Sequence, residues 1–281
     1  MRKIIIALFT VSLSLFLSTA NAQDLKIPQP STTQHIDQDF GLGKVSVTYS
    51  RPNMKGRAIF GSMEPYGQVW RTGANYATRI KLTDSITMAG HGVAAGEYSL
   101  FTIPGPKAWT IVLNKTVEQW GAYAYDSTKD VLRFSVPTTR LEPKLETFTI
   151  TFGNMNVEHG DLQLMWENTL VAIPIVVDAD AQVMANIDKA MQTEKKPYYF
   201  AAIYYYNHNK DMSKALAWMQ ERDKAQPNAY NIKYWLAKIQ LKMGDKTAAI
   251  ASANEGLKLA TAENSTEYIR MNKEVLADAN K

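Results

Sequence analysis

The sequence predicts an α+β protein with segregated domains: an N-terminal antiparallel β-sandwich, jelly-roll-like, followed by an α-helical repeat tail. Two observations predict this class. Before Val177, apolar residues recur at every second position, as they do in strands with one buried face. Beyond Val177 they recur at every third or fourth position, prolines become scarce, and alanine and lysine rise, as in amphipathic helices.

The N-terminal segment has the order of a secretory signal peptide. Arg2 and Lys3 precede an apolar stretch over residues 4–17, and small residues follow up to Ala22. The apolar stretch is shorter than the roughly 20 residues of a membrane-spanning helix, which disfavours the alternative of a retained anchor. We predict a signal peptide at 1–22, cleavage near Ala22, an extended leader at 23–34, and a periplasmic or secreted mature protein without a membrane span.

Composition excludes several classes of function. The chain has no cysteine, which excludes disulfides, thiolate catalysis and cysteine metal sites. The formal charge of +4 is spread along the chain rather than gathered on one basic face, so no nucleic-acid partner is expected. The four histidines lack metal-ligand spacing, and no nucleotide fingerprint is present, so neither a metal nor a cofactor is expected.

The first domain, residues 35–178, has the pattern of eight to ten short strands. Apolar, β-branched and aromatic residues alternate with polar ones, and Gly, Pro, Asn or Asp separate the runs. Strands are expected at 45–49, 80–82, 86–88, 98–103, 109–113, 131–136, 148–152, 162–166 and 170–177. No helical period interrupts them, which favours a sandwich over a parallel α/β sheet.

The second domain, residues 179–281, has the pattern of six amphipathic helices. Asp211 and Asp245 stand 34 residues apart, as do Ala215 and Ala249, and this period resembles that of the tetratricopeptide repeat. Two degenerate repeats and a capping helix near residues 267–279 are expected. Asp245 is a predicted helix N-cap, and Asn264 with Glu267 has the spacing of a capping box.

Two repeats are fewer than the three that usually bury their faces, so we predict that the helical tail docks against the β-domain. The tail also carries a dense aromatic run at residues 198–206. This run fits either core packing together with contact to the β-domain, or an interface with a protein partner.

The most distinctive segment is the loop region of residues 49–79, which is long, irregular and rich in glycine and proline. Such loops within a compact domain are uncommon and often functional. The candidate ligand-binding residues are Tyr49, Arg51, Arg57, Tyr66, Trp70, Arg71 and Asn75. Guanidinium groups offer forked donors and aromatic rings offer stacking faces, so an anionic or glycan ligand would fit. Alternatively, the arginines pair with acids or backbone carbonyls and hold the loop in place.

Acidic residues give no catalytic motif. Glu64, Asp126, Asp130 and Glu142 are interpreted as solvated loop acids. A pair of carboxylates at the separation used by glycosidases is not recognisable from sequence.

Five segments of the first domain are distinctive: YSRPNMKGRAIFG, PYGQVWRTGAN, AGEYSLFTIPG, WTIVLN and ETFTITF. Together they resemble a bacterial exported family catalogued as domain of unknown function 2911, over roughly residues 36–174. The resemblance implies a β-rich domain and no established activity. In that family a glutamate usually follows the asparagine of the second segment, where this chain has Tyr76.

Two functional hypotheses follow. The first is an exported, non-enzymatic binding protein whose loop region holds a ligand and whose helical tail contacts a protein partner. The alternative is a cell-envelope hydrolase acting on glycan or peptide through the same loop, with an arginine stabilising developing charge. A deep pocket holding a buried carboxylate or histidine with a perturbed pKa favours the enzyme.

Overall fold

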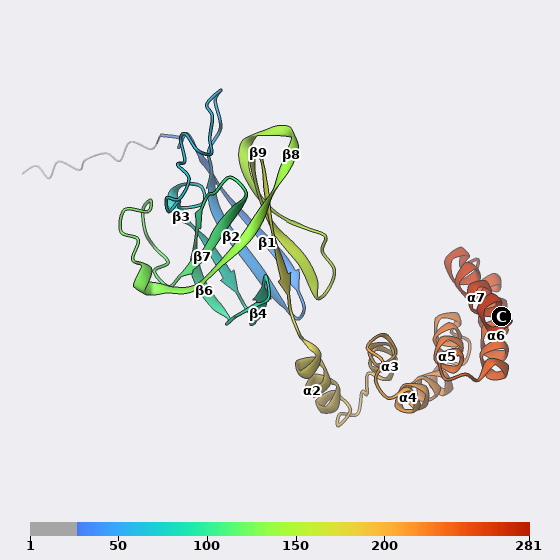
Figure 1. Ribbon diagram of the computed structural model, residues 1–281. Helices are drawn as coiled ribbons and strands as arrows, with labels where there is room; N and C mark the ends of the chain where they lie inside the picture. Colours follow the sequence, from blue (N-terminus) through green and yellow to red (C-terminus); the bar gives the residue numbers. More distant parts are fainter. Residues whose placement is uncertain (1–26) are drawn as a thin grey trace, which may run out of the picture. The chain divides into compact units, whose positions relative to one another are not determined.

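The computed structural model describes residues 27–281, and the chain divides into two compact units between Asp178 and Ala179 (Figure 1). The predicted signal peptide at 1–22 lies outside the described residues. Among residues 27–281, no helix combines the length and the apolar content that crossing a lipid bilayer requires.

The first unit is an antiparallel sheet of nine strands in the order β1-β2-β3-β6-β7-β8-β9-β4-β5 (Figure 1). The strands are β1 (Thr32–Phe40), β2 (Gly43–Arg51), β3 (Ala74–Leu82), β4 (Ile86–Met88), β5 (His91–Val93), β6 (Gly96–Ile103), β7 (Ala108–Asn114), β8 (Asp130–Gly153) and β9 (His159–Val176), with one 3-10 helix, η1 (Ser127–Lys129). The predicted β-rich first part is confirmed.

Strand β8 belongs to both layers of the sandwich. Its residues 130–137 pair with β7, and its residues 138–153 pair with β9, which also pairs with β4. The sheet therefore folds back on itself within one strand, and the two layers face each other across a common core.

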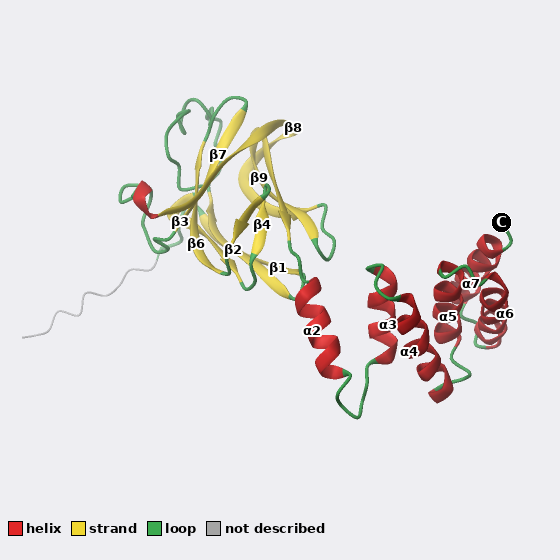
Figure 2. Cartoon of the chain, turned by 60° about the horizontal axis from the view of Figure 1, so that its bottom comes forward, coloured by secondary structure: helices red, strands yellow, loops and turns green. Residues whose placement is uncertain are grey.

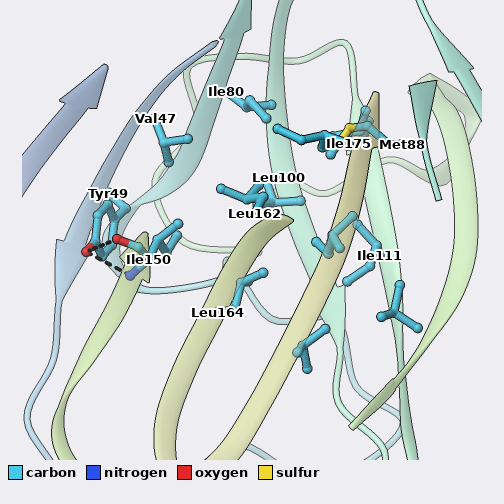
Figure 3. Close-up of a cluster of buried hydrophobic side chains, with 14 of the residues drawn as sticks. Val47, Tyr49, Ile80, Met88, Leu100, Ile111, Ile150, Leu162, Leu164 and Ile175 are labelled. Carbon is cyan, nitrogen blue, oxygen red and sulfur yellow. Dashed lines mark hydrogen bonds between the residues drawn. The ribbon is translucent and has the colours of Figure 1, made fainter. Parts of the chain in front are cut away.

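Apolar side chains from both layers fill this core (Figure 3). Val47, Ile80, Leu100 and Ile111 from one layer, and Ile150, Leu162, Leu164 and Ile175 from the other, are all at most 1% exposed. Within each strand they alternate with more exposed residues, because successive side chains of a strand point to opposite faces.

The strands differ from the expected ones in two respects. Strand β1 begins at Thr32, inside the predicted leader at 23–34, and pairs with β2 along its whole length. Its polar, largely exposed sequence gives no alternating apolar signal. Four expected strands form two long ones, β8 and β9. In the sequence, Glu142-Pro143 has the character of a turn between two strands. In the structure β8 continues through this dipeptide, with a shift of register between Arg140 and Leu145.

The second unit consists of six helices, as predicted (Figure 2). They are α2 (Asp180–Ala190), α3 (Tyr198–Asn207), α4 (Met212–Ala225), α5 (Tyr230–Lys242), α6 (Lys246–Ala262) and α7 (Thr266–Ala279). Consecutive helices from α3 onward pack against each other.

Helices α4 and α6 begin in the same way, 34 residues apart. The Asp211 carboxylate accepts from the Lys214 N–H at 3.1 Å, and the Asp245 carboxylate accepts from the Ala248 N–H at 2.9 Å. The predicted cap at Asp245 is confirmed. The predicted capping box at Asn264 is wrong, because Ser265 is the N-cap of α7 and Asn264 has a φ of 56°.

Candidate ligand-binding site

The loop between β2 and β3 is fixed to the core by apolar side chains. Met54, Ile59 and Trp70 are buried, and the ring of Phe60 lies 4.7 Å from that of Trp109 and 5.9 Å from that of Trp70. A loop of this length is therefore held by aromatic packing, and the polar side chains between its anchors have defined positions.

The backbone at the end of this loop is strained. Thr72 and Asn75 have φ values of 56° and 59°, and Gly73 between them has a φ of 150°. A branched residue such as threonine rarely adopts this conformation. Thr72 is fully buried, and its carbonyl accepts from the Thr78 hydroxyl at 2.6 Å. Strain that the surroundings maintain in this way is typical of functional sites.

This loop borders a cavity of about 390 Å³. Its side-chain lining is mostly polar and cationic: Asn53, Lys55, Arg57, Glu64 and Arg71. Pro30 and Ser31, which precede β1, contribute to the wall. Three cations thus surround one carboxyl group, an arrangement that favours an anionic ligand.

The two arginines of the cavity differ in how many of their N–H donors are hydrogen-bonded to the protein. The Arg57 Nε and Nη2 atoms donate to the carbonyls of Met54 and Asn53 at 2.8 and 2.7 Å. Arg71 donates through Nε to the Gly73 carbonyl at 3.4 Å. Within residues 27–281, the terminal nitrogens of Arg71 have no hydrogen-bond or ion-pair partner.

Glu64 is half-buried, and burial raises the pKa of its carboxyl to about 7, against the opposing effect of Arg71 and Arg57. No ion pair joins Glu64 to either arginine in the described part of the chain. A carboxyl and a guanidinium thus face the same cavity without neutralising each other. The interpretation of Glu64 as a solvated loop acid is wrong, because the packed loop half-buries its carboxyl.

Asp130 is likewise not solvated. Its side chain is 8% exposed, and it accepts from Arg133, Tyr125 and Asn114. This carboxylate holds the start of β8 and lies outside the cavity.

The candidate residues of the sequence divide into two groups. Arg57 and Arg71 line the cavity. Arg51 instead donates to the Phe148 carbonyl at 3.2 Å and to the Thr149 hydroxyl at 2.8 Å, so it ties the layers together.

Tyr49 and Trp70 are 2% and 4% exposed and belong to the core, although Tyr49 also borders a smaller cavity beside β1, β2 and β3. Trp70 stacks at 5.9 Å from Trp166, and its Nε1 donates to the Gly73 carbonyl.

Tyr66 and Asn75 do not line the cavity. Tyr66 is 44% exposed and lies over Gly61, where a Cβ would come within 2.5 Å of its ring. The Asn75 Nδ2 donates to the Ser31 carbonyl at 3.1 Å and the Ser50 hydroxyl at 3.3 Å, so it holds the start of β1 beside the loop.

Sequence reasoning missed Glu64, Lys55 and Asn53 as lining residues. All three lie in the loop that was singled out, so composition found the region and not the side chains. The sequence gives one signal for Glu64, which is its position between Met63 and Pro65, five residues after Ile59. In the structure the Glu64 N–H donates to the Ile59 carbonyl, and this turn brings the chain back toward the core.

The aromatic run of the helical unit is partly in its core and partly exposed. Tyr205 is buried, whereas Phe200 is 74% exposed. Tyr206 packs against Trp235 and lies beneath the ammonium groups of Lys238 and Lys242.

Comparison with known proteins gives one finding. The sequence profile of a family described as "Protein of unknown function (DUF2911)" matches residues 31–175, from just before β1 into β9. The chain has no significant match among curated proteins or among solved structures.

Proposed function

The chain belongs to this family, DUF2911, and because its description names no activity, we propose from the cavity that the β-unit binds a small carboxylate-bearing ligand. An acidic sugar or the carboxylate of a short peptide has the required chemistry. We also propose that the protein is exported, which the signal-peptide pattern of residues 1–22 supports, and that its role is non-enzymatic.

The unoccupied donors of Arg71 carry this proposal. A guanidinium offers a planar fork that matches a carboxylate, and charge-assisted bonds of this kind are about twice as strong as neutral ones. Arg57, oriented by two backbone carbonyls, and the exposed Lys55 add positive charge around the same cavity.

Glu64 gives the binding a pH dependence. With a pKa of about 7, the carboxyl is largely neutral below pH 7 and can donate a hydrogen bond to an anion. Above pH 7 it is ionised, repels the anion and competes for Arg71. Lys55, Arg57 and Arg71 are its cationic neighbours, while Glu146 and Glu167 accept from the backbone N–H groups of the same loop.

The test is calorimetric titration of the full-length protein with glucuronate and N-acetylmuramate, and with glucose and N-acetylglucosamine as neutral counterparts. We expect the acids to bind and the neutral sugars not to bind at this cavity. Arg71→Ala should weaken binding of the acids by about 10–100-fold, the equivalent of a charge-assisted hydrogen bond.

Arg140→Ala is the matched control. Arg140 is 74% exposed, pairs with Glu142 and lies outside the cavity, so its loss should leave affinity unchanged. Equal affinity of the Arg71→Ala and wild-type proteins for every acid would remove the basis of the proposal. Wild-type affinity should also fall between pH 6 and pH 8, and Glu64→Gln should abolish that fall.

A hydrolase acting on glycan or peptide is the second candidate, and Glu64 is the observation that favours it. A carboxyl with a pKa near 7 can serve as a general acid at neutral pH, with Arg71 stabilising developing negative charge. Incubation with envelope glycan and stem peptides, followed by mass spectrometry of the products, tests this role. Turnover that survives in Glu64→Gln, or no turnover by the wild type, would contradict it.

We propose that the helical unit contacts a protein partner, and the exposed Phe200 supports this. The Phe200 ring is 74% exposed near the start of α3 and packs edge to face on Tyr199, and aromatic residues are enriched at protein interfaces. Capture from an envelope extract with wild type and Phe200→Ala tests the surface, with Met243→Ala as a second exposed apolar position for comparison.

A further inference from the structure

A second, separate cavity lies on the outer face of β1, β2 and β3. Its volume is about 220 Å³, and its lining includes Thr33, Thr48, Tyr76, Arg79, Val117 and Glu118. It shares none of its lining residues with the cavity of Arg57 and Arg71. Its function is therefore argued independently of the function proposed above.

An exposed aromatic pair lies at this cavity. Tyr76 and Trp120 are 60% and 54% exposed, and their ring centroids are 5.0 Å apart at an angle of 83°. Tyr76 lines the cavity, and the edge-to-face contact with Trp120 supports its ring.

The backbone fixes this pair in place. Tyr76 and Trp120 form a β-bridge, the Ala77 N–H donates to the Gln119 carbonyl, and the Gly121 N–H donates to the Asn75 carbonyl. The rings are therefore exposed on a rigid support rather than on a loop free to bury them. Large apolar side chains kept exposed in this way usually mark a binding surface.

The two charged residues that line this cavity, Arg79 and Glu118, have opposite charges, unlike the three cations and one carboxyl group of the first cavity. The Arg79 guanidinium lies 3.7 Å from the Glu118 carboxylate and 3.8 Å from that of Glu97. A free anion or cation therefore gains little here. Arginine donors, carboxylate acceptors and the hydroxyls of Thr33 and Thr48 instead suit a neutral ligand that has both donors and acceptors.

From these observations we propose that this cavity binds one ring of a neutral sugar chain, stacked on Tyr76, with its hydroxyls bonded to Arg79 and Glu118. The C–H face of a pyranose is apolar and its rim is polar, which matches an aromatic ring surrounded by hydrogen-bonding groups. A volume of about 220 Å³ is below the roughly 300–1,000 Å³ of sites for drug-sized ligands and suits a single ring.

Titration of the full-length protein with the neutral trisaccharides chitotriose, cellotriose and maltotriose tests this inference, with a hexapeptide pool as the alternative occupant. We expect at least one trisaccharide to bind. Tyr76→Ala should weaken it at least tenfold, whereas Tyr76→Phe should retain it because the ring and not the hydroxyl stacks.

Tyr123→Ala is the matched control, since Tyr123 is 87% exposed and does not line the cavity. Arg71→Ala should also bind the trisaccharide like the wild type, which separates this site from the acid-binding one. No binding of any trisaccharide at millimolar concentration, unchanged binding by Tyr76→Ala, or Tyr76-dependent binding of the peptides alone would overturn the inference.

Discussion

At the residue scale, the hydroxyl of Tyr49 connects the two layers of the sandwich (Figure 3). It donates to the Gln34 side chain at 2.7 Å or to the Ile150 carbonyl at 3.1 Å, and it accepts from the Ile150 N–H at 2.8 Å. One buried oxygen thus satisfies a backbone group of the opposite layer.

Tyr49→Phe should therefore lower the free energy of unfolding by about 1–3 kcal/mol, because the buried Ile150 N–H loses its partner. Urea unfolding measures this loss. Tyr66→Phe, at an exposed ring, should change little, and affinity for the acids should be unchanged in both variants, since neither ring lines the cavity of Arg57 and Arg71. A stability loss at Tyr66 equal to that at Tyr49 would contradict this account.

Glu64 makes stability depend on pH. The pKa of its carboxyl is about 7 in the folded chain and 4.5 in its ordinary range, so the folded state binds more protons between these values. Stability should consequently fall as pH rises from about 4.5 to 7. Glu64→Gln removes this dependence, and urea midpoints at pH 5 and pH 8 for both proteins measure it.

The two proteins share every histidine, so the difference between their pH profiles isolates Glu64. The carboxyls of Asp37 and Asp126 have pKa values lowered from 3.8, chiefly by hydrogen bonds, and titrate below this window. Parallel profiles for the two proteins would show that Glu64 is ionised throughout.

Residue types in the loop did not predict which contacts each arginine makes. Arg51, Arg57 and Arg71 are equivalent in the sequence, yet Arg51 ties the layers, while the terminal nitrogens of Arg71 have no partner among residues 27–281. The distinction depends on which carbonyls lie within reach. Contacts between β2 and β8, nearly 100 residues apart, decide it, and no local pattern contains them.

At the element scale, Lys233 joins three helices. Its side chain is 8% exposed and pairs with Asp223 of α4 at 2.9 Å and with Glu255 of α6 at 3.1 Å. These hydrogen bonds raise the pKa of Lys233 against the effect of burial. Lys233 thus links α4, α5 and α6 through one buried ammonium group.

Lys233→Met should destabilise the helical unit by roughly 3 kcal/mol, because Asp223 keeps its partly buried charge without a cation. Lys224→Met, which removes an exposed pair with Glu221, should have little effect. Thermal unfolding followed by circular dichroism at 222 nm compares them. Equal melting temperatures for the two variants would mean that the Lys233 network adds nothing.

Helices were more predictable than strands for a physical reason. The apolar residues that form the buried face of a helix recur within the sequence of that helix, and N-cap residues such as Asp245 mark where the helix begins. Strand β1 is stabilised by pairing with β2 and has mostly exposed side chains, so its own sequence does not identify it.

At the scale of the whole molecule, the helical unit is short for a free-standing repeat array. Its core contains few large aliphatic side chains and includes Ala202, Tyr205, Met219, Leu236 and Ile239. Two repeats and a cap are fewer than the three units that usually bury their faces, so we predict that the helical unit alone is only marginally stable.

Expression of residues 180–281 alone tests this prediction. We expect a broad unfolding transition at a lower temperature than in the full chain, because so short a repeat array leaves part of its apolar surface exposed. Calorimetry of the fragment and of the full chain measures both. A sharp transition at the temperature of the full chain would show that the helices need no support.

The sharing of β8 between the layers limits where this protein can change length. Phe134 and Val136 are buried in the part of β8 that pairs with β7, and Phe148 and Ile150 are buried in the part that pairs with β9. One residue inserted beside Val136 would turn the side chains from there to residue 140 to the opposite face of the strand. Residues 141–147 already depart from regular pairing and are largely exposed, so an insertion there can be absorbed. Chains of this family whose β8 strands differ in length should therefore differ within the segment that corresponds to residues 141–147.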